Sequence, residues 1–219
     1  MKGLITILFA FLTLSFFGQE RDFQTWYSFG LDMKLSEKLK ADFGNEVRLR
    51  ENSSIIERNQ ADLGIRYRLK THWSFRVAYR LVFEDPFLES YSIANRFLAD
   101  ITYKYEHKRL EISSRLRLAT DPEEPQYASE LFSQVIHREK ITLSYNLPKT
   151  TLAPYIAGEL FFPISAANPY LSKYRVMAGF DYKLNKTNRI GISLLNQWKC
   201  SGKVPSSQTV VLLEYLIKL

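Results

Sequence analysis

Charged residues recur at every second position along much of this sequence. Between 96 and 117, Arg96, Asp100, Arg115 and Arg117 each have apolar neighbours in the chain. Acids and bases that share one face can pair across strands, or line a narrow wet path that favours anions because arginine is in excess. The residues expected to line such an interior are Glu46, Arg48, Arg66, Arg76, Arg80, Arg96, Asp100, Glu111, Arg115, Arg117, Glu159 and Arg175.

One histidine is a candidate for nucleophilic catalysis. His72 and His107 fall in expected turns, whereas His137 lies in a strand-like stretch with Ser133 four residues upstream. A serine beside a histidine base is the arrangement of many lipid hydrolases. Four residues of strand separate the two side chains by roughly 13 Å, so they would meet only through a bulge or a neighbouring strand. The sequence therefore predicts no enzyme, with a barrel-type lipid hydrolase as the lesser alternative.

No motif for a metal or a phosphate-bearing cofactor is present. The sequence has no glycine-rich phosphate loop, no cysteine pair and no His-x-x-x-His spacing. The acidic loop 121–125 could offer oxygen ligands to calcium, although a solvated loop held by two prolines explains it as well. Cys200 is the single cysteine and cannot form an internal disulfide. We expect no cofactor and no metal.

The alternation itself indicates β-strands. From 23 to 35 the odd positions are nearly all apolar, whereas Gln24, Ser28, Gly30, Asp32 and Lys34 between them are polar or small, and successive strand side chains point to opposite faces. The pattern recurs to the end of the chain, giving eleven strand-like segments and no amphipathic helix. The stretch 137–145 is irregular, because His137 and Glu139 share the face of Ile141. A bulge is expected there to restore the register.

The connections alternate in length. Short turns are expected at 36–38, 70–72, 106–109, 146–151 and 185–188, and longer polar loops at 51–59, 85–92, 120–129, 163–172 and 200–208. This arrangement predicts an all-β, antiparallel, up-and-down transmembrane β-barrel with its short turns in the periplasm. Bacterial single-chain barrels have even strand numbers. We therefore predict ten to twelve strands, with twelve favoured and a missed or split strand near 127–145.

Alternation alone does not decide which face meets water, but the aromatic residues favour lipid on the apolar face. They cluster beside the short turns, where a membrane barrel has its interfacial girdle. The expected girdle residues are Tyr67, Trp73, Tyr103, Tyr105, Tyr145 and Tyr182. Glycines on the polar face suit the inside of a curved barrel. The terminal Tyr215, Ile217 and Leu219 resemble an outer-membrane insertion signal.

Length and composition fit one exported domain. A chain of 219 residues with 46% hydrophobic content can form a single barrel. Residues 1–18 have the basic start and short apolar run of a secretory signal peptide, which leaves 19–219 as the barrel domain. The net charge of +7 would suit nucleic acid. Basic residues spread over every second position of a secreted chain speak against that partner.

Several runs are similar to one bacterial outer-membrane family. They are Lys34–Lys38, Leu63–Leu69 followed by Trp73–Phe75, Ser114–Leu118, Pro154–Tyr155 leading to Glu159–Phe162, and Arg175–Tyr182. Together they resemble the family catalogued as domain of unknown function 2490, over nearly the whole mature chain. The resemblance implies the fold and an outer-membrane location. It implies no activity, and no site residue carries over from it.

These observations lead to one expected function and one rival. We expect an outer-membrane β-barrel that contacts membrane lipid and, during biogenesis, the barrel-insertion machinery. Its interior is either structural and filled or a porin-like, narrow, anion-leaning conduit for small solutes. The rival is a secreted soluble β-barrel that binds a hydrophobic ligand. The oligomeric state does not follow from the sequence.

Overall fold

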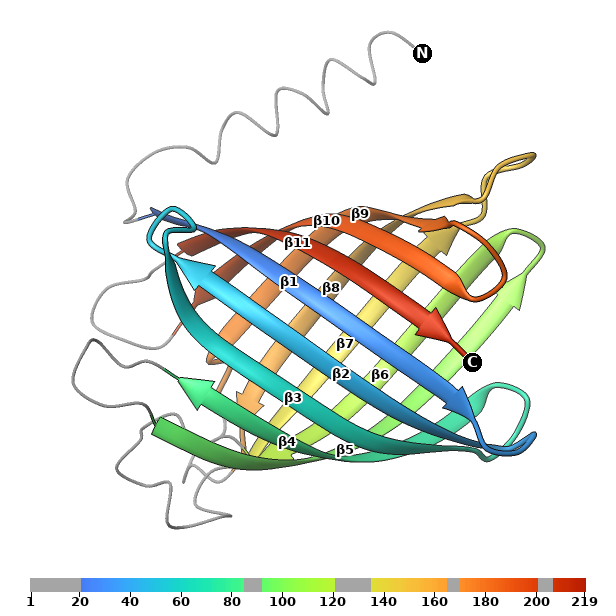
Figure 1. The fold of residues 1–219 in the computed structure, drawn as a ribbon, viewed down its shortest axis with the longest axis horizontal. Helices are drawn as coiled ribbons and strands as arrows, with labels where there is room; N and C mark the ends of the chain where they lie inside the picture. The colour runs from blue at the N-terminus through green and yellow to red at the C-terminus, as the bar shows by residue number, and fades with distance from the viewer. Residues whose placement is uncertain (1–20, 85–91, 121–134, 165–169, 201–206) are drawn as a thin grey trace, which may run out of the picture.

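The computed structural model describes residues 21–84, 92–120, 135–164, 170–200 and 207–219. These residues form eleven strands that close into one barrel (Figure 1). The predicted signal peptide at 1–18 lies outside them. The strands are β1 (Arg21–Lys34), β2 (Leu39–Arg50), β3 (Ile55–Arg68), β4 (Trp73–Glu84), β5 (Ser92–His107), β6 (Leu110–Thr120), β7 (Val135–Tyr145), β8 (Leu152–Pro163), β9 (Lys173–Lys183), β10 (Asn188–Lys199) and β11 (Ser207–Lys218).

The barrel closes through a parallel pair of strands. Strands that follow each other in the chain pair antiparallel, but β1 pairs with β11 in parallel, from Arg21 opposite Ser207 to Asp32 opposite Lys218. The sheet is therefore mixed, and the prediction of a fully antiparallel barrel is wrong. Parallel closure lets an odd number of strands form a ring without an unpaired edge. It also places the start of β1 and the end of β11 at opposite ends of the barrel (Figure 1).

The strand number falls in the predicted range but not at the favoured value. Eleven lies between ten and twelve, whereas the preference for twelve is wrong for the described residues. The described part of the region thought to hide a further strand, 135–145, forms β7, and β7 has no bulge. Its register runs unbroken from Leu110 opposite Tyr145 to Thr120 opposite Val135. His137 therefore stays on the outer face, where its Nε2 lies 3.0 Å from Glu139 Oε1.

The irregularity lies in β3 instead. Arg48 opposes Arg58 and Leu49 opposes Ile56, so Glu57 is an extra residue in the ladder. The connection before β3 spans only 51–54, which makes the expected long loop at 51–59 wrong. Glu51, Asn52 and Ser53 turn the chain with φ of 53°, 57° and 65°. The polar residues that follow belong to β3. The sequence pattern did not indicate a strand there, because polar residues are typical of loops.

The apolar faces of the strands point away from the barrel interior. Phe75, Leu116 and Ile192 are 38%, 43% and 52% exposed, while Asp100 and Glu159 are 3% and 2% exposed. Two small apolar clusters lie on the inner wall. One contains Trp26, Ala157, Met177, Leu195, Val210 and Leu212, and the other Ala78, Leu98 and Ala119. Among the described residues no helix is long and apolar enough to cross a membrane.

Candidate functional site: the charged interior

Bidentate arginine–aspartate pairs cross the interior on the wall formed by β2 to β6. Arg76 Nε donates to both carboxylate oxygens of Asp42, at 3.0 and 2.9 Å. Arg117 donates to Asp100 through Nε and Nη2, at 2.6 and 2.7 Å. The planar guanidinium matches two carboxylate oxygens at once, which fixes the geometry of each pair. A third bidentate pair joins Arg80 and Asp62, at 2.5 and 2.8 Å.

Glu159 on β8 is the centre of a second group. Arg115 Nη2 and Arg138 Nη2 each donate to its Oε1 at 2.8 Å, and Arg175 Nη1 donates to Oε2 at 3.4 Å. Three guanidinium groups therefore share one carboxylate. Arg175 also donates through Nε to Gln197 Oε1 at 2.6 Å, which ties the group to β10.

Two aromatic rings that point inward, those of Trp26 and Phe161, contact basic side chains of the interior. The guanidinium carbons of Arg48 and Arg175 lie 3.8 and 5.2 Å from the centre of the Trp26 ring. Arg138, Lys173 and Arg175 lie 4.5 to 4.7 Å from the centre of the Phe161 ring. Cations are attracted to the face of an aromatic ring, more strongly where water is excluded. The rings thus stabilise a cluster in which arginines outnumber carboxylates.

A third group lies toward the longer connections. Glu84 pairs with Arg58 and with Arg96, whose Nη2 lies 3.3 Å away. Glu46 accepts from Arg48 Nε and from Gln60 Nε2, both at 2.7 Å. Together the three groups bring side chains from β2 to β9 into the interior.

All twelve predicted interior residues lie on the inner face. Most belong to the three groups above, together with Asp42, Asp62 and Arg138, which the alternation also places inside. Two stand apart. Arg66 is only loosely paired, 3.8 Å from Asp32 and from Asp42. Glu111 pairs with Lys104 at 2.8 Å near the turn that joins β5 and β6.

The sequence prediction missed Arg58 and Trp26. Arg58 was assigned to the loop 51–59, and the alternation of β3 through 58, 60 and 62 was the available signal. Trp26 occupies an even, polar-face position of β1, and it is 3% exposed inside the barrel. A large aromatic residue out of phase with the apolar face was the signal for an interior role.

The six predicted girdle aromatics lie on the outer face, near the strand ends joined by short turns. Tyr67, Trp73, Tyr105, Tyr145 and Tyr182 have exposed rings. Tyr103 is half-buried, because the rings of Trp73 and His72 pack against it at 4.9 and 5.8 Å between centres.

Several polar residues of the outer face are paired with one another. Asn45 Nδ2 donates to Asn59 Oδ1 at 2.9 Å, and Thr209 Oγ1 donates to Asn196 Oδ1 at 2.9 Å. Tyr79 donates its hydroxyl proton to Asn95 Oδ1. Polar groups in an apolar medium are costly unless they are hydrogen-bonded. These pairs lie in the halves of the strands that lead to the longer connections, opposite the aromatic ring.

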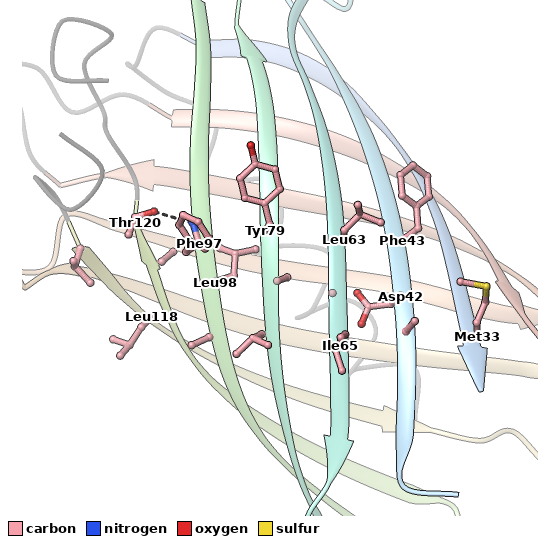
Figure 2. Close-up of a pocket in the computed structure, with 17 residues that line it drawn as sticks. Met33, Asp42, Phe43, Leu63, Ile65, Tyr79, Phe97, Leu98, Leu118 and Thr120 are labelled. Atoms are coloured by element: carbon pink, nitrogen blue, oxygen red, sulfur yellow. Dashed lines mark hydrogen bonds between the residues drawn. The ribbon is translucent and has the colours of Figure 1, made fainter. Parts of the chain in front are cut away.

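The outer face also carries an apolar hollow of about 720 Å³. Figure 2 shows Leu63, Ile65, Tyr79 and Phe97 along its neighbouring strands, with Met33 and Leu118 toward its two sides. Small side chains such as those of Ala41 and Ala99 leave space between the larger ones here. Most of its lining residues lie on the outer face, but Asp42, which pairs with Arg76 inside the barrel, also lines it.

The structure brings no catalytic or metal-binding group together in the part of the chain that it describes. His137 contacts Glu139 and the Phe162 ring on the outer face. Ser133 and the acidic loop 121–125 lie outside the described residues. No cluster of three or more His, Cys, Asp or Glu suited to a metal occurs in the described ranges. Cys200 is exposed, with a free thiol.

Comparison with known proteins supports the resemblance seen in the sequence. A search of curated proteins found no match. A family model described as a protein of unknown function, DUF2490, matches residues 23–205, which covers β2 to β10 and all of β1 except its first two residues, and which ends before β11. This barrel therefore belongs to the DUF2490 family.

Proposed function

We propose that this chain is an outer-membrane β-barrel whose apolar outer face meets lipid and whose interior is filled by ion pairs. In this proposal it is neither an enzyme nor an open pore. The observation that supports it most is the distribution of side chains, with Leu116 and Ile192 exposed outside and Asp100 and Glu159 buried inside. Soluble monomers rarely expose contiguous apolar patches larger than a few hundred Å². Here exposed apolar residues occur on the outer face of every strand except β2, whose outer residues are half-buried.

The length of the strands and the closure of the barrel also support the proposed membrane location. The described strands are 11 to 16 residues long, and a tilted strand needs about 9–11 residues to cross a bilayer. A closed ring pairs its backbone groups internally, as hydrocarbon requires. The aromatic residues beside the short turns suit one membrane interface, and the paired polar residues on the opposite side suit the other.

Cell fractionation tests the membrane location. The chain is expected to sediment with outer membranes and to leave them only in detergent, because its outer face is apolar. After boiling it should migrate differently on a gel, as folded barrels do when they unfold. Recovery from the soluble periplasm without detergent would remove the proposal and favour the rival soluble barrel. Lipid and the barrel-insertion machinery are its proposed partners.

A narrow anion conduit is the second candidate. The observation that favours it is the excess of guanidinium groups around Glu159, which would attract anions along any open path. The ion-pair groups occupy the centre of the barrel, however, and we expect the refolded protein to give no steady single-channel current in planar bilayers. An anion-selective current that reverses selectivity with Arg76→Glu and Arg115→Glu would establish the conduit instead.

The soluble ligand-binding rival is less well supported. A barrel that carries a hydrophobic molecule needs an apolar interior cavity. Here the described interior is dominated by Arg76, Asp100, Arg117 and Glu159, while the apolar hollow lies on the outer face.

A further inference from the structure

A cavity of about 760 Å³ lies at the end of the barrel where the short turns are. Lys38 from the turn between β1 and β2, His72 from the turn between β3 and β4, and Lys218 at the end of β11 surround its mouth. Its volume is in the range of small-molecule sites, roughly 300–1,000 Å³. We refer to this cavity as the vestibule.

The vestibule ends against the ion pairs of the interior. Arg76, Asp100 and Arg117 line it, and all three are buried. Arg117 holds Asp100 in a bidentate pair, and Arg76 Nη1 lies 3.6 Å from Asp100 Oδ2. We refer to these buried side chains, which form the inner end of the vestibule lining, as its floor. A solute that enters from the short-turn end would therefore stop there.

The lining carries a large excess of positive charge. It includes ten lysine or arginine side chains and four aspartate or glutamate side chains. Three of the four acids are already engaged, Asp32 by Arg66, Asp62 by Arg80 and Asp100 by Arg117. A concave surface of one charge sign, with walls of low dielectric constant, concentrates ions of the opposite sign.

Several cations of the lining have no carboxylate of their own. Lys40, Arg68 and Lys218 make no ion pair within 4 Å with any described residue, although Lys218 directly opposes Asp32, which Arg66 also contacts. Lys40 directly opposes Arg66, and Arg66 directly opposes Arg76, so three basic residues stand side by side across β2, β3 and β4. Like charges in directly opposed positions destabilise a sheet. A bound anion would relieve this repulsion.

We propose that the vestibule binds a small solute that carries two or more negative charges on phosphate or carboxylate groups. Two charges are required because the unpaired cations come from separate strands, Lys40 from β2, Arg68 from β3 and Lys218 from β11. Arginine matches phosphate and carboxylate through its planar fork, and lysine adds a mobile point charge. The site depends on the closed barrel alone and not on its membrane location. It differs from a conduit in that the solute is held at a closed floor.

Calorimetric titration of the refolded barrel in a zwitterionic detergent at low salt tests this site. Inorganic pyrophosphate and citrate are the multivalent probes, and acetate is the monovalent comparison. We expect saturable binding of one pyrophosphate or citrate per barrel, and weaker binding of acetate. Replacing Lys40, Arg68 and Lys218 together by glutamine should lower the affinity by roughly tenfold or more, because the attracting field is lost. If pyrophosphate binds and citrate does not, the solute class narrows to phosphates.

A charge-matched control separates a site from general attraction. Lys70, Lys149 and Lys186 lie in short turns at the same end and do not line the vestibule. Their joint replacement by glutamine should leave the affinity within roughly twofold, since the lining is intact. An equal loss in both variants, or no saturable binding up to about 10 mM probe, would overturn the proposal. If the vestibule variant does not refold, Lys218→Gln alone, at a strand end, gives the same readout. Failure here with the barrel recovered in outer membranes would leave the proposed function standing.

Discussion

Glu159 is the residue on which the central ion-pair group depends most. It is the only carboxylate shown within hydrogen-bond distance of Arg115, Arg138 and Arg175 in the described part of the chain. Burial of an ion is compensated only when its partners are in place. Removing this one negative charge leaves three guanidinium groups facing each other.

We therefore expect Glu159→Gln to destabilise the barrel by about 3 kcal/mol or more, as for other buried pairs that lose one partner. Urea unfolding of the refolded protein, followed by tryptophan fluorescence, measures this change. Glu37→Gln is the control, because Glu37 is exposed in a turn and its replacement should cost less than about 0.5 kcal/mol. Equal stability of the two variants would show that the central group contributes little.

Gly64 makes room for one of the bidentate pairs. A Cβ at this position would lie 2.6 Å from Asp42 Oδ2 and 2.8 Å from Arg76 Nε. Gly64→Ala should displace the pair and lower the free energy of unfolding by about 1 kcal/mol or more, as overpacking does. Gly158→Ala is the matched control on the outer face, where a Cβ would meet nothing within 4 Å. Similar unfolding midpoints for both alanine variants would contradict the close approach at Gly64.

At the residue scale, the alternation could be used to predict which charges lie inside but not which of them pair. The inward position of Arg117 follows from its place in the strand. Its bond to Asp100 depends on the register of β5 against β6, which no local pattern specifies. Trp26 was overlooked because aromatic residues were expected only on the lipid face, and its contact with Arg48 depends on strands folded beside each other.

At the scale of the elements, the parallel pairing of β1 with β11 is the feature that least resembles the expected barrel. Tyr27 directly opposes Leu213 in this pair. Opposed residues on adjacent strands have Cα atoms about 5 Å apart, which suits a disulfide. With Cys200→Ser to remove the free thiol, Tyr27→Cys combined with Leu213→Cys should cross-link under mild oxidation.

The control for this prediction combines Tyr27→Cys with Leu219→Cys. Leu219 lies just beyond β11 and six residues after Leu213, which is roughly 20 Å of extended chain, so no disulfide should form in the folded barrel. Gel migration without reductant distinguishes the two variants. A cross-link in the control and none in the test pair would show that β1 and β11 do not pair in this register.

The strands themselves were largely predictable because a period of two extends through most of them. The exceptions have local physical reasons. The polar residues before Gln60 suggested a loop, although Arg58 and Glu57 belong to a bulged strand. His137 and Glu139 suggested a bulge in β7, although the two side chains satisfy each other on the outer face. The sequences of β1 and β11 carry no signal for their parallel pairing, because the direction of pairing depends on how the whole ring closes.

At the scale of the whole molecule, the barrel is apolar outside and charged inside, with a cationic vestibule at one end. The odd number of strands goes with the parallel closure. As a result, the start of β1 and the end of β11 lie at opposite ends of the barrel. If the short turns face the periplasm, as in bacterial barrels, the vestibule opens there. Under the proposed function, the apolar outer face would meet lipid and the vestibule would receive periplasmic anions.

Quenching of tryptophan fluorescence by brominated lipid tests the orientation of the two faces most directly. The starting protein carries Trp73→Phe and Trp198→Phe, so that Trp26 is its one remaining tryptophan. In vesicles of phosphatidylcholine brominated on its acyl chains, Trp26 should emit as in ordinary lipid, because it lies inside the barrel. Adding Leu116→Trp should introduce emission that the bromines quench. Quenching of Trp26, with emission from position 116 unaffected, would contradict the account.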